Sequence, residues 1–226
     1  MTSAVVLQAR LDSGRLPGKS LLPLGGEPLI FRVMEAFKTA SFGGYILACP
    51  EECAEVFAPL AERAGFLVYP GSKEDVLSRY CGAIRRYNLD WVIRATGDNP
   101  FVFADAAEAL HRSACALDAD YAGYAGLPHG AGVESVKASA LLEAERNAVL
   151  QSEREHVCPY LYNHPELFYL HRPLAPALWR GSGLRVTVDT REDYEKAKTL
   201  YERLEKAGTP CRHQGKYVIA AAEALR

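Results

Sequence analysis

The chain has 226 residues, of which 49% are hydrophobic and 24% charged, a composition typical of a folded globular protein. The formal net charge is −2, so no overall basic field draws the chain to nucleic acid or to an anionic membrane, and we expect neither as a partner. No apolar run approaches the roughly 20 residues that span a bilayer, and the N-terminal residues lack a signal-peptide pattern, so we expect a cytoplasmic protein.

The cysteines are scattered and show no C-x-x-C or other zinc-type spacing. We expect reduced thiols, as is usual in the cytosol, and no metal site at the closest pair, Cys49 and Cys53. The remaining cysteines are Cys81, Cys115, Cys158 and Cys211.

In the first half of the chain, short apolar runs alternate with segments of helical periodicity. This alternation predicts βαβ units and a three-layer α/β/α fold with a mostly parallel, Rossmann-like sheet. Ligands of such sheets bind beyond the carboxyl ends of the strands, where the loops at Arg10–Lys19 and Gly97–Pro100 would lie. The predicted strands are Ala4–Leu7, Tyr45–Ala48, Phe66–Tyr69 and Trp91–Ala95, and the predicted helices are 29–37, Cys53–Arg63, Asp75–Tyr87 and Ala104–Leu117.

The second half is less regular, and we expect residues 120–180 to be a small elaboration on a single domain that covers residues 1–226. Helices are predicted at Ala138–Ala148, Glu153–Asn163 and Arg191–Ala207, and strands at Asp120–Tyr124, Gly132–Val136, Phe168–His171 and Leu184–Val188.

The segment after the first predicted strand, Gln8-Ala9-Arg10-Leu11-Asp12-Ser13-Gly14-Arg15-Leu16-Pro17-Gly18-Lys19, is the most informative part of the sequence. It combines three basic residues with glycines, and phosphate recognition requires both fixed positive charge and closely approaching backbone N–H groups. It matches neither the P-loop nor the dinucleotide fingerprint. On spacing alone, a phosphate site and a solvated surface loop remain equally open.

This segment, followed by Pro23-Leu24-Gly25-Gly26-Glu27-Pro28-Leu29, resembles the opening of the cytidylyltransferase superfamily, and most closely the spore-coat polysaccharide biosynthesis protein F family. CMP-sialate and CMP-ketodeoxyoctonate synthetases are more distant relatives. The resemblance implies a fold of the nucleotide-diphospho-sugar transferase type and a homodimer whose interface involves residues 120–180. Further matches follow in order at Asp75–Tyr80, Arg94–Pro100, Gly132–Glu134, Glu153–His156 and Arg185–Tyr194.

The resemblance also implies an activity: a sugar or sugar acid attacks the α-phosphate of CTP and releases pyrophosphate. Catalysis of such transfers is mostly positioning and charge neutralisation. Arg10, Arg15 and Lys19 would hold the triphosphate, and the loss of Lys19, outside the regular elements, is expected to cost little stability, within about 0.5 kcal/mol. The other implied nucleotide contacts are Gln8, Ala9, Ser13, Gly14, Gly71, Ser72, Asp75, Arg79 and Arg94, and the implied acceptor contacts are Glu134, Glu153 and His156.

By the same resemblance, the catalytic residues are Arg10, Lys19, Asp98 and Asp189. The two aspartates would bind Mg²⁺, an ion that prefers carboxylate oxygens. Each has a structural alternative in the sequence itself. Asp98 lies in Gly-Asp-Asn-Pro, which forms turns readily. Asp189 precedes Thr190, a plausible N-cap with Asp193 at the third helical position, so Asp189 could simply favour a helix N-terminus.

One residue departs from the pattern of the relatives, which usually have a small residue at the position of Asp12. A carboxylate facing a triphosphate is repulsive, by roughly 1 kcal/mol or more at about 4 Å. Either Asp12 points away from the phosphates or the loop contacts them differently, with Gly14 supplying extra backbone freedom.

Three other functions stay open. A nucleotidyltransferase could use another nucleotide, because residues that hold phosphates do not read the base. A sugar-nucleotide glycosyltransferase usually carries a D-x-D metal motif, which Asp118-Ala119-Asp120 matches, although a predicted helix rather than a strand precedes it. A protein that binds nucleotide without turnover is the third alternative.

Overall fold

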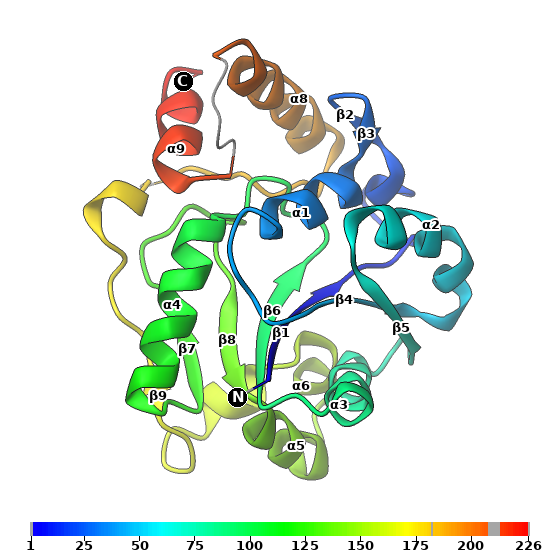
Figure 1. Ribbon diagram of the computed structural model, residues 1–226, viewed down its shortest axis with the longest axis vertical. Coiled ribbons are helices and arrows are strands. Elements are labelled where there is room, and N and C mark those ends of the chain that lie inside the picture. The colour runs from blue at the N-terminus through cyan, green and yellow to red at the C-terminus, as the bar shows by residue number, and fades with distance from the viewer. Residues whose placement is uncertain (1, 182, 208–212, 226) are drawn as a thin grey trace.

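The computed structural model describes residues 2–181, 183–207 and 213–225, and within these residues one sheet has the strand order β5-β4-β1-β6-β8-β7-β9 (Figure 1). The predicted three-layer α/β/α fold with a mostly parallel sheet is confirmed. The strands are β1 (Ser3–Gln8), β4 (Tyr45–Pro50), β5 (Leu67–Gly71), β6 (Trp91–Thr96), β7 (Tyr121–Gly123), β8 (Glu134–Lys137) and β9 (Leu170–His171), and a separate hairpin pairs β2 (Pro23–Leu24) with β3 (Glu27–Pro28).

The parallel half of the sheet consists of β5, β4, β1 and β6, and β1 lies between β4 and β6. Gln8 at the end of β1 pairs with Thr96 at the end of β6. The loops that follow these two strands therefore leave the sheet side by side, at the edge where parallel α/β folds bind ligands.

The 120–180 region extends this same sheet. β8 runs antiparallel to β6 and β7 antiparallel to β8, so β7 is parallel to β6, and β9 pairs in parallel with β7. The Asp118-Ala119-Asp120 motif precedes β7 and so lies at the amino edge, away from the carboxyl ends of β1 and β6.

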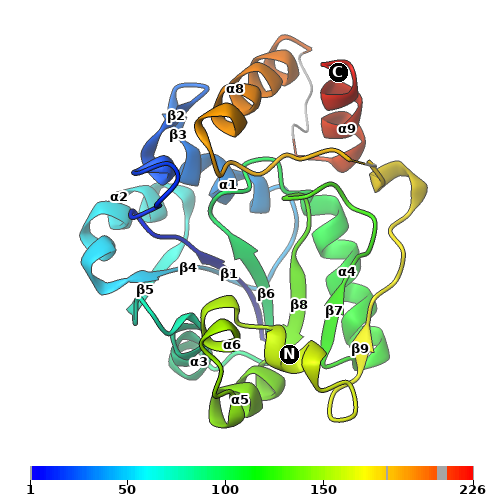
Figure 2. The ribbon, with the colours of Figure 1, turned by 180° about the vertical axis from the view of Figure 1, so that it is seen from behind.

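Helices cover both faces of the sheet because β1 alternates its buried side chains: Val5 and Leu7 face one hydrophobic cluster, Ala4 and Val6 the other. Figures 1 and 2 show α8 and α9 side by side at one end of the molecule. The first cluster includes α1 (Leu29–Phe37), α2 (Ala54–Ala64), α4 (Ala104–Leu117), α8 (Arg191–Lys206) and α9 (Gly215–Glu223). The second includes α3 (Val76–Tyr87), α5 (Ala138–Asn147) and α7 (Pro159–Asn163), with α6 (Gln151–His156) against α3. Short 3₁₀ turns occupy Lys19–Leu21, Glu51–Cys53 and Ala177–Trp179.

Two expected elements differ from the structure. Leu184–Val188 is extended, but it is not a strand of the sheet. Its backbone bonds to loops instead: Val186 N donates to His129 O at 2.8 Å, and Val188 N donates to Asp98 O at 2.8 Å. The alternating apolar residues of this segment indicate that one side of it is buried. A loop segment hydrogen-bonded to other loops can bury that side just as a strand can, so the pattern did not distinguish the two.

The predicted helix Glu153–Asn163 is interrupted at Val157, which has φ 75° and ψ −57°. Cys158 N donates to His156 O at 2.9 Å, so these three residues form a γ-turn. Pro159 has no amide hydrogen with which to continue α6. The β2–β3 hairpin and α9 were not expected from the sequence.

None of the helices in the described residues is long and apolar enough to cross a membrane. The five cysteines of this part of the chain are free thiols, and Cys211 lies outside the described residues. Burial raises the pKa of the Cys49 thiol to about 12.

Candidate active site

The loop after β1 and the loop after β6 meet closely. Gly97 N donates to Gln8 O at 2.8 Å, and a Cβ at Gly97 would come within 2.7 Å of Ile30 Cδ1. Any larger residue at position 97 would therefore force its neighbours to move. The basic loop is fixed from within, because Ser20 Oγ donates to Arg10 O at 2.9 Å. Gly18, with φ 67°, turns the chain into the short 3₁₀ helix that begins at Lys19.

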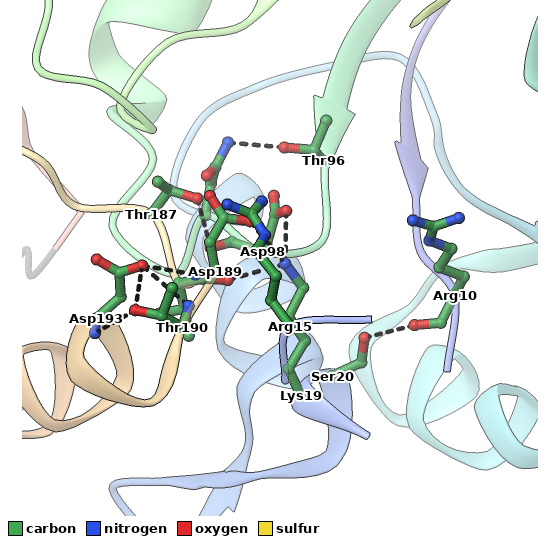
Figure 3. A network of polar contacts seen from close by, with 12 residues as sticks. Arg10, Arg15, Lys19, Ser20, Thr96, Asp98, Thr187, Asp189, Thr190 and Asp193 are labelled. Atoms are coloured by element: carbon green, nitrogen blue, oxygen red, sulfur yellow. Dashed lines mark hydrogen bonds and ion pairs between the residues drawn. The ribbon is translucent and has the colours of Figure 1, made fainter. Parts of the chain in front are cut away.

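Lys19 joins the two predicted metal ligands. Its Nζ lies 2.9 Å from Asp98 Oδ2, 3.2 Å from Asp189 Oδ1 and 2.9 Å from Val188 O. Figure 3 shows the lysine side chain reaching between the two aspartates, whereas Arg10 stands apart at the end of β1. The structure thus brings Asp98 and Asp189 to one place, although Asp189 does not follow a strand of the sheet.

Asp189 also contacts two arginines: Arg15 Nη2 lies 2.9 Å from Oδ1, and Arg185 Nη2 lies 2.5 Å from Oδ2. Burial by itself would raise the pKa of Asp189, but Lys19, Arg15 and Arg185 hold this pKa below its ordinary value of 3.8. Asp189 is therefore an anion at neutral pH.

The helix cap at the start of α8 is made by other residues. Asp193 N donates to Thr190 Oγ1 at 3.2 Å, and Thr190 N donates to Asp193 Oδ2 at 3.0 Å. This capping box does not use the carboxylate of Asp189, which lines the cavity described next.

A cavity of about 400 Å³ lies over the ends of β1 and β6. It brings together many of the residues that the sequence singled out: Gln8, Ala9, Arg10, Ser13, Gly14, Arg15, Lys19, Arg79, Asp98, His156 and Asp189. Glu155, beside His156 on the same predicted helix, also lines it, as does Gly97 of the predicted ligand-edge loop. The lining residues that were not predicted as site residues are Ser20, Lys73, Glu74, Val76 and Thr96.

Arg79 is buried, with 3% of its surface exposed, so it is not a solvated helix residue. Its Nη1 donates to Ser72 O at 2.8 Å, while its Nε has no partner among the described residues. Burial lowers the pKa of the guanidinium. A buried donor without an acceptor is costly, and a ligand in the adjoining cavity could supply that acceptor.

Asp75 and Glu153 do not line this cavity. The Asp75 carboxylate caps α3 by accepting a hydrogen bond from Ser78 N at 2.9 Å, and it pairs with Arg154 at 2.5 Å. Glu153 is 4% exposed, and its Oε2 accepts a 3.4 Å hydrogen bond from Leu150 N at the start of its own helix. Both carboxylates are therefore engaged in structural contacts, and Gly71 and Ser72 also lie outside the lining.

Arg94 and Glu134 face each other directly in the β6–β8 register and form an ion pair. Tyr121 Oη donates to Glu134 Oε1 at 2.8 Å. Burial opposes the charge on Arg94, but Glu134 raises the pKa of Arg94 above its ordinary value. The pair lines a second cavity of about 530 Å³, which shares Thr96, Asp98 and Asp189 with the first.

Asp12 pairs with a residue of the first cavity without lining that cavity itself. Its Oδ2 lies 2.5 Å from Lys73 Nζ, and this hydrogen bond lowers the pKa of Asp12 below its ordinary value. Asp12 is not among the residues that line the cavity. The carboxylate is thus engaged by Lys73, and its orientation toward a bound triphosphate stays a prediction.

A mostly parallel sheet whose carboxyl edge carries a basic loop beside two carboxylates defines an α/β protein with its ligand site at that edge, and the basic loop suits an anionic ligand. The chain belongs to the cytidylyltransferase family, whose model matches residues 4–222, and is therefore a nucleotidyltransferase.

Relatives and solved structures agree with this assignment. The chain is 33% identical to the spore coat polysaccharide biosynthesis protein SpsF of Bacillus subtilis over 205 residues, which cover 88% of the chain and 85% of that protein. A solved cytidylyltransferase from Leptospira borgpetersenii has a TM-score of 0.88 and 25% identity, covering 100% of this chain and 94% of that one. CMP:2-keto-3-deoxy-manno-octonic acid synthetase, solved with CTP, shares the fold with a TM-score of 0.70 at 16% identity, covering 89% and 99% of the two chains.

Proposed function

We propose that this protein transfers CMP from CTP to a sugar or sugar acid and releases pyrophosphate, in the synthesis of a polysaccharide precursor. The observation that carries the proposal is the position of Asp98 and Asp189, which Lys19 holds together at the junction of two cavities. One cavity has a basic wall that suits a triphosphate. The other opens beside the same carboxylates and has room for an acceptor.

The nucleotide would occupy the first cavity. Arg10, Arg15 and Lys19 come from one loop and supply positive charge for the phosphates, and the backbone near Ser13 and Gly14 supplies N–H donors. Lysine acts here as a compact point charge that can follow the leaving pyrophosphate. The base and ribose would extend toward Arg79, whose Nε is without a partner among the described residues.

The residues at the junction fit a magnesium ion. Asp98, Asp189 and the Val188 carbonyl present oxygen atoms to one cation, the Lys19 ammonium. Mg²⁺ prefers oxygen ligands and is often held by one or two carboxylates together with substrate phosphates. No cluster of three or more His, Cys, Asp or Glu side chains suited to a metal occurs in the described residues, so the proposed site relies on two carboxylates and the substrate phosphates. When bound, the metal would neutralise charge on the α-phosphate.

The acceptor would enter the second cavity, next to Asp98 and Asp189, so that its nucleophilic oxygen reaches the α-phosphate from that side. Arg94 and Glu134 line this cavity as an ion pair, and the hydrogen bond from Tyr121 holds the Glu134 carboxylate in place. His156 would contact the acceptor or the nucleotide from the wall of the first cavity. The homodimer and the cytoplasmic location stay predictions.

The glycosyltransferase alternative receives no support from the geometry of its motif. Asp118 and Asp120 both pair with Lys137, at 2.9 and 3.4 Å, at the amino edge of the sheet. A D-x-D motif serves a sugar nucleotide only where it meets the ligand edge.

Two measurements test the proposal. Pyrophosphate release from CTP with Mg²⁺ is measured with a panel of sugars and sugar acids, and the reaction without acceptor reports hydrolysis. Thermal-shift titrations with CTP, UTP, GTP and ATP in Mg²⁺ report base preference, because a ligand that binds only the native state raises Tm. We expect acceptor-dependent pyrophosphate release and the largest shift with CTP. Equal shifts for CTP and ATP would contradict the cytidine assignment, and hydrolysis that no acceptor increases would contradict transfer.

A further inference from the structure

The Lys19 ammonium lies among the oxygen atoms that the proposed function assigns to the metal. Its three oxygen partners at 2.9–3.2 Å come from Asp98, Asp189 and Val188, which are the atoms best placed to bind a cation. The lysine side chain is 12% exposed and the two aspartates 28% and 14%. Solvent therefore screens these contacts only weakly, and the ammonium is a strong competitor for the site.

The same two carboxylates are already surrounded by positive charge. Arg15 and Arg185 bind the two oxygens of Asp189, in addition to Lys19. Arg185 also lies 3.3 Å from Asp193 Oδ1, so among the described residues three cations balance three carboxylates and no negative charge is left over for a divalent ion. A free divalent ion that entered this cluster would meet uncompensated repulsion unless Lys19 left.

We propose that Lys19 is a placeholder for the metal: it holds Asp98 and Asp189 in position and excludes free Mg²⁺, so that the metal enters only together with the triphosphate. This inference rests on the proposed function, because it takes the two aspartates as the metal ligands.

The triphosphate is the ligand that can remove the lysine. Lys19 belongs to the loop that lines the nucleotide cavity with Arg10, Ser13 and Gly14, and its four-carbon stem lets the ammonium swing toward phosphate oxygens without moving the loop. The Lys19 ammonium would exchange its carboxylate partners for phosphate oxygens, so its positive charge would still be paired with negative charge. The vacated carboxylates would then be free to accept the metal that accompanies the phosphates.

The test measures metal binding directly, with no turnover. Mn²⁺ serves as the probe, and the electron paramagnetic resonance signal of the free ion reports how much is bound. Each protein is titrated alone and with a CTP analogue in which a methylene group joins the α- and β-phosphorus atoms, so that CMP transfer cannot occur. The variants are Lys19→Met, Lys19→Gln, Lys19→Arg and Arg15→Met, each checked for a cooperative thermal transition.

We expect the wild-type protein to bind Mn²⁺ weakly alone and about tenfold or more tightly with the analogue, within the usual range for coupling between two ligands. Lys19→Met and Lys19→Gln should bind Mn²⁺ tightly without the analogue. Lys19→Arg keeps the charge and should still exclude the ion. Arg15→Met is the matched control, because it removes a cation from Asp189 but leaves Asp98 paired with Lys19. It should change Mn²⁺ affinity far less than Lys19→Met does.

Two results would overturn the inference while leaving the proposed function intact. One is tight Mn²⁺ binding by the wild-type protein without nucleotide. The other is an equal gain in affinity for Arg15→Met and Lys19→Met, which would show a general charge effect and no placeholder. If no variant binds Mn²⁺ even with the analogue, the metal site of the proposed function is wrong as well.

Discussion

Asp98 and Asp189 both accept a hydrogen bond from the ammonium of Lys19, although one carboxylate follows β6 and the other precedes α8. Two anions that share one cation cannot be treated as independent groups. Removing either changes the field that the other experiences, and this coupling determines what substitutions at the site should do.

Asp98→Asn and Asp189→Asn should each raise the Mg²⁺ concentration needed for half-maximal activity and lower turnover by about 10²-fold or more. The double variant should lose less than the product of the single losses, because ligands of one metal act as a unit. The measurement is turnover as a function of Mg²⁺ concentration for the wild type, the two single variants and the double variant. If Asp189→Asn lowers the free energy of unfolding but leaves the Mg²⁺ dependence unchanged, Asp189 is a structural residue only.

Lys19→Met should remove most activity and, unlike the expectation from its position in a loop, should also reduce stability. Its ammonium makes three partly buried hydrogen bonds to oxygen atoms, two of them on carboxylates. Loss of such contacts typically lowers the free energy of unfolding by about 1–3 kcal/mol. Urea denaturation of the wild type, Lys19→Met and the exposed control Lys196→Met measures the difference. If Lys19→Met lowers the free energy of unfolding no more than Lys196→Met does, then Lys19 contributes little to stability, as its position in a loop suggested.

Asp12→Asn should strengthen CTP binding. Lys73 lines the nucleotide cavity and is paired with Asp12, and exposed ion pairs of this kind contribute about 0–1 kcal/mol. Releasing the ammonium toward the triphosphate should therefore lower the Kd for CTP by up to about fivefold.

The control variant for this prediction is Lys73→Met, which should weaken CTP binding because it removes the ammonium. Both changes in affinity are electrostatic, so both should become smaller at high salt. Fluorescence or calorimetric titration provides the Kd values. An Asp12→Asn protein with unchanged affinity would mean that Lys73 does not reach the nucleotide.

Asp193→Ala tests the capping box at α8 through its pH dependence. Burial by itself would raise the pKa of Asp193, but hydrogen bonds from Thr190, the Asp189 and Thr190 backbone amides and Arg185 lower this pKa below its ordinary value of 3.8. A depressed folded-state pKa stabilises the protein above the unfolded-state pKa, and this stabilisation is lost as pH falls through the folded-state pKa.

The variant should therefore be about 0.5–2 kcal/mol less stable at pH 7, and the gap to the wild type should narrow as pH falls below 3.8. Glu202→Ala, on the exposed side of the same helix, is the control and should change little. Denaturant melts between pH 3 and pH 7 measure the gap. A gap that stays constant with pH would rule out an ionised carboxylate as its source.

The parallel half of the fold was predictable because its apolar runs and helical periods are local and strong. The same is true of the basic loop and of Asp98, whose positions follow from the strands that precede them. Lys73 escaped prediction because only the folded chain brings it to Asp12. The ion pair between Arg94 and Glu134 depends on an antiparallel register that the sequence did not reveal. Glu153 lies on a helix, as expected, but periodicity alone did not show that its side chain is buried.

The backbone hydrogen bond between Val188 and Asp98 helps to hold the two mutually repelling aspartates close together. Val188 N donates to the Asp98 carbonyl at 2.8 Å, so the backbone that carries one carboxylate is fastened directly to the backbone that carries the other. The electrostatic cost of bringing the Asp98 and Asp189 carboxylates together is therefore met during folding. The distance between them does not have to be set again in each catalytic cycle. Shortening or lengthening the 183–188 segment by a single residue should consequently change the spacing of the two carboxylates more than any substitution on the surface of that segment.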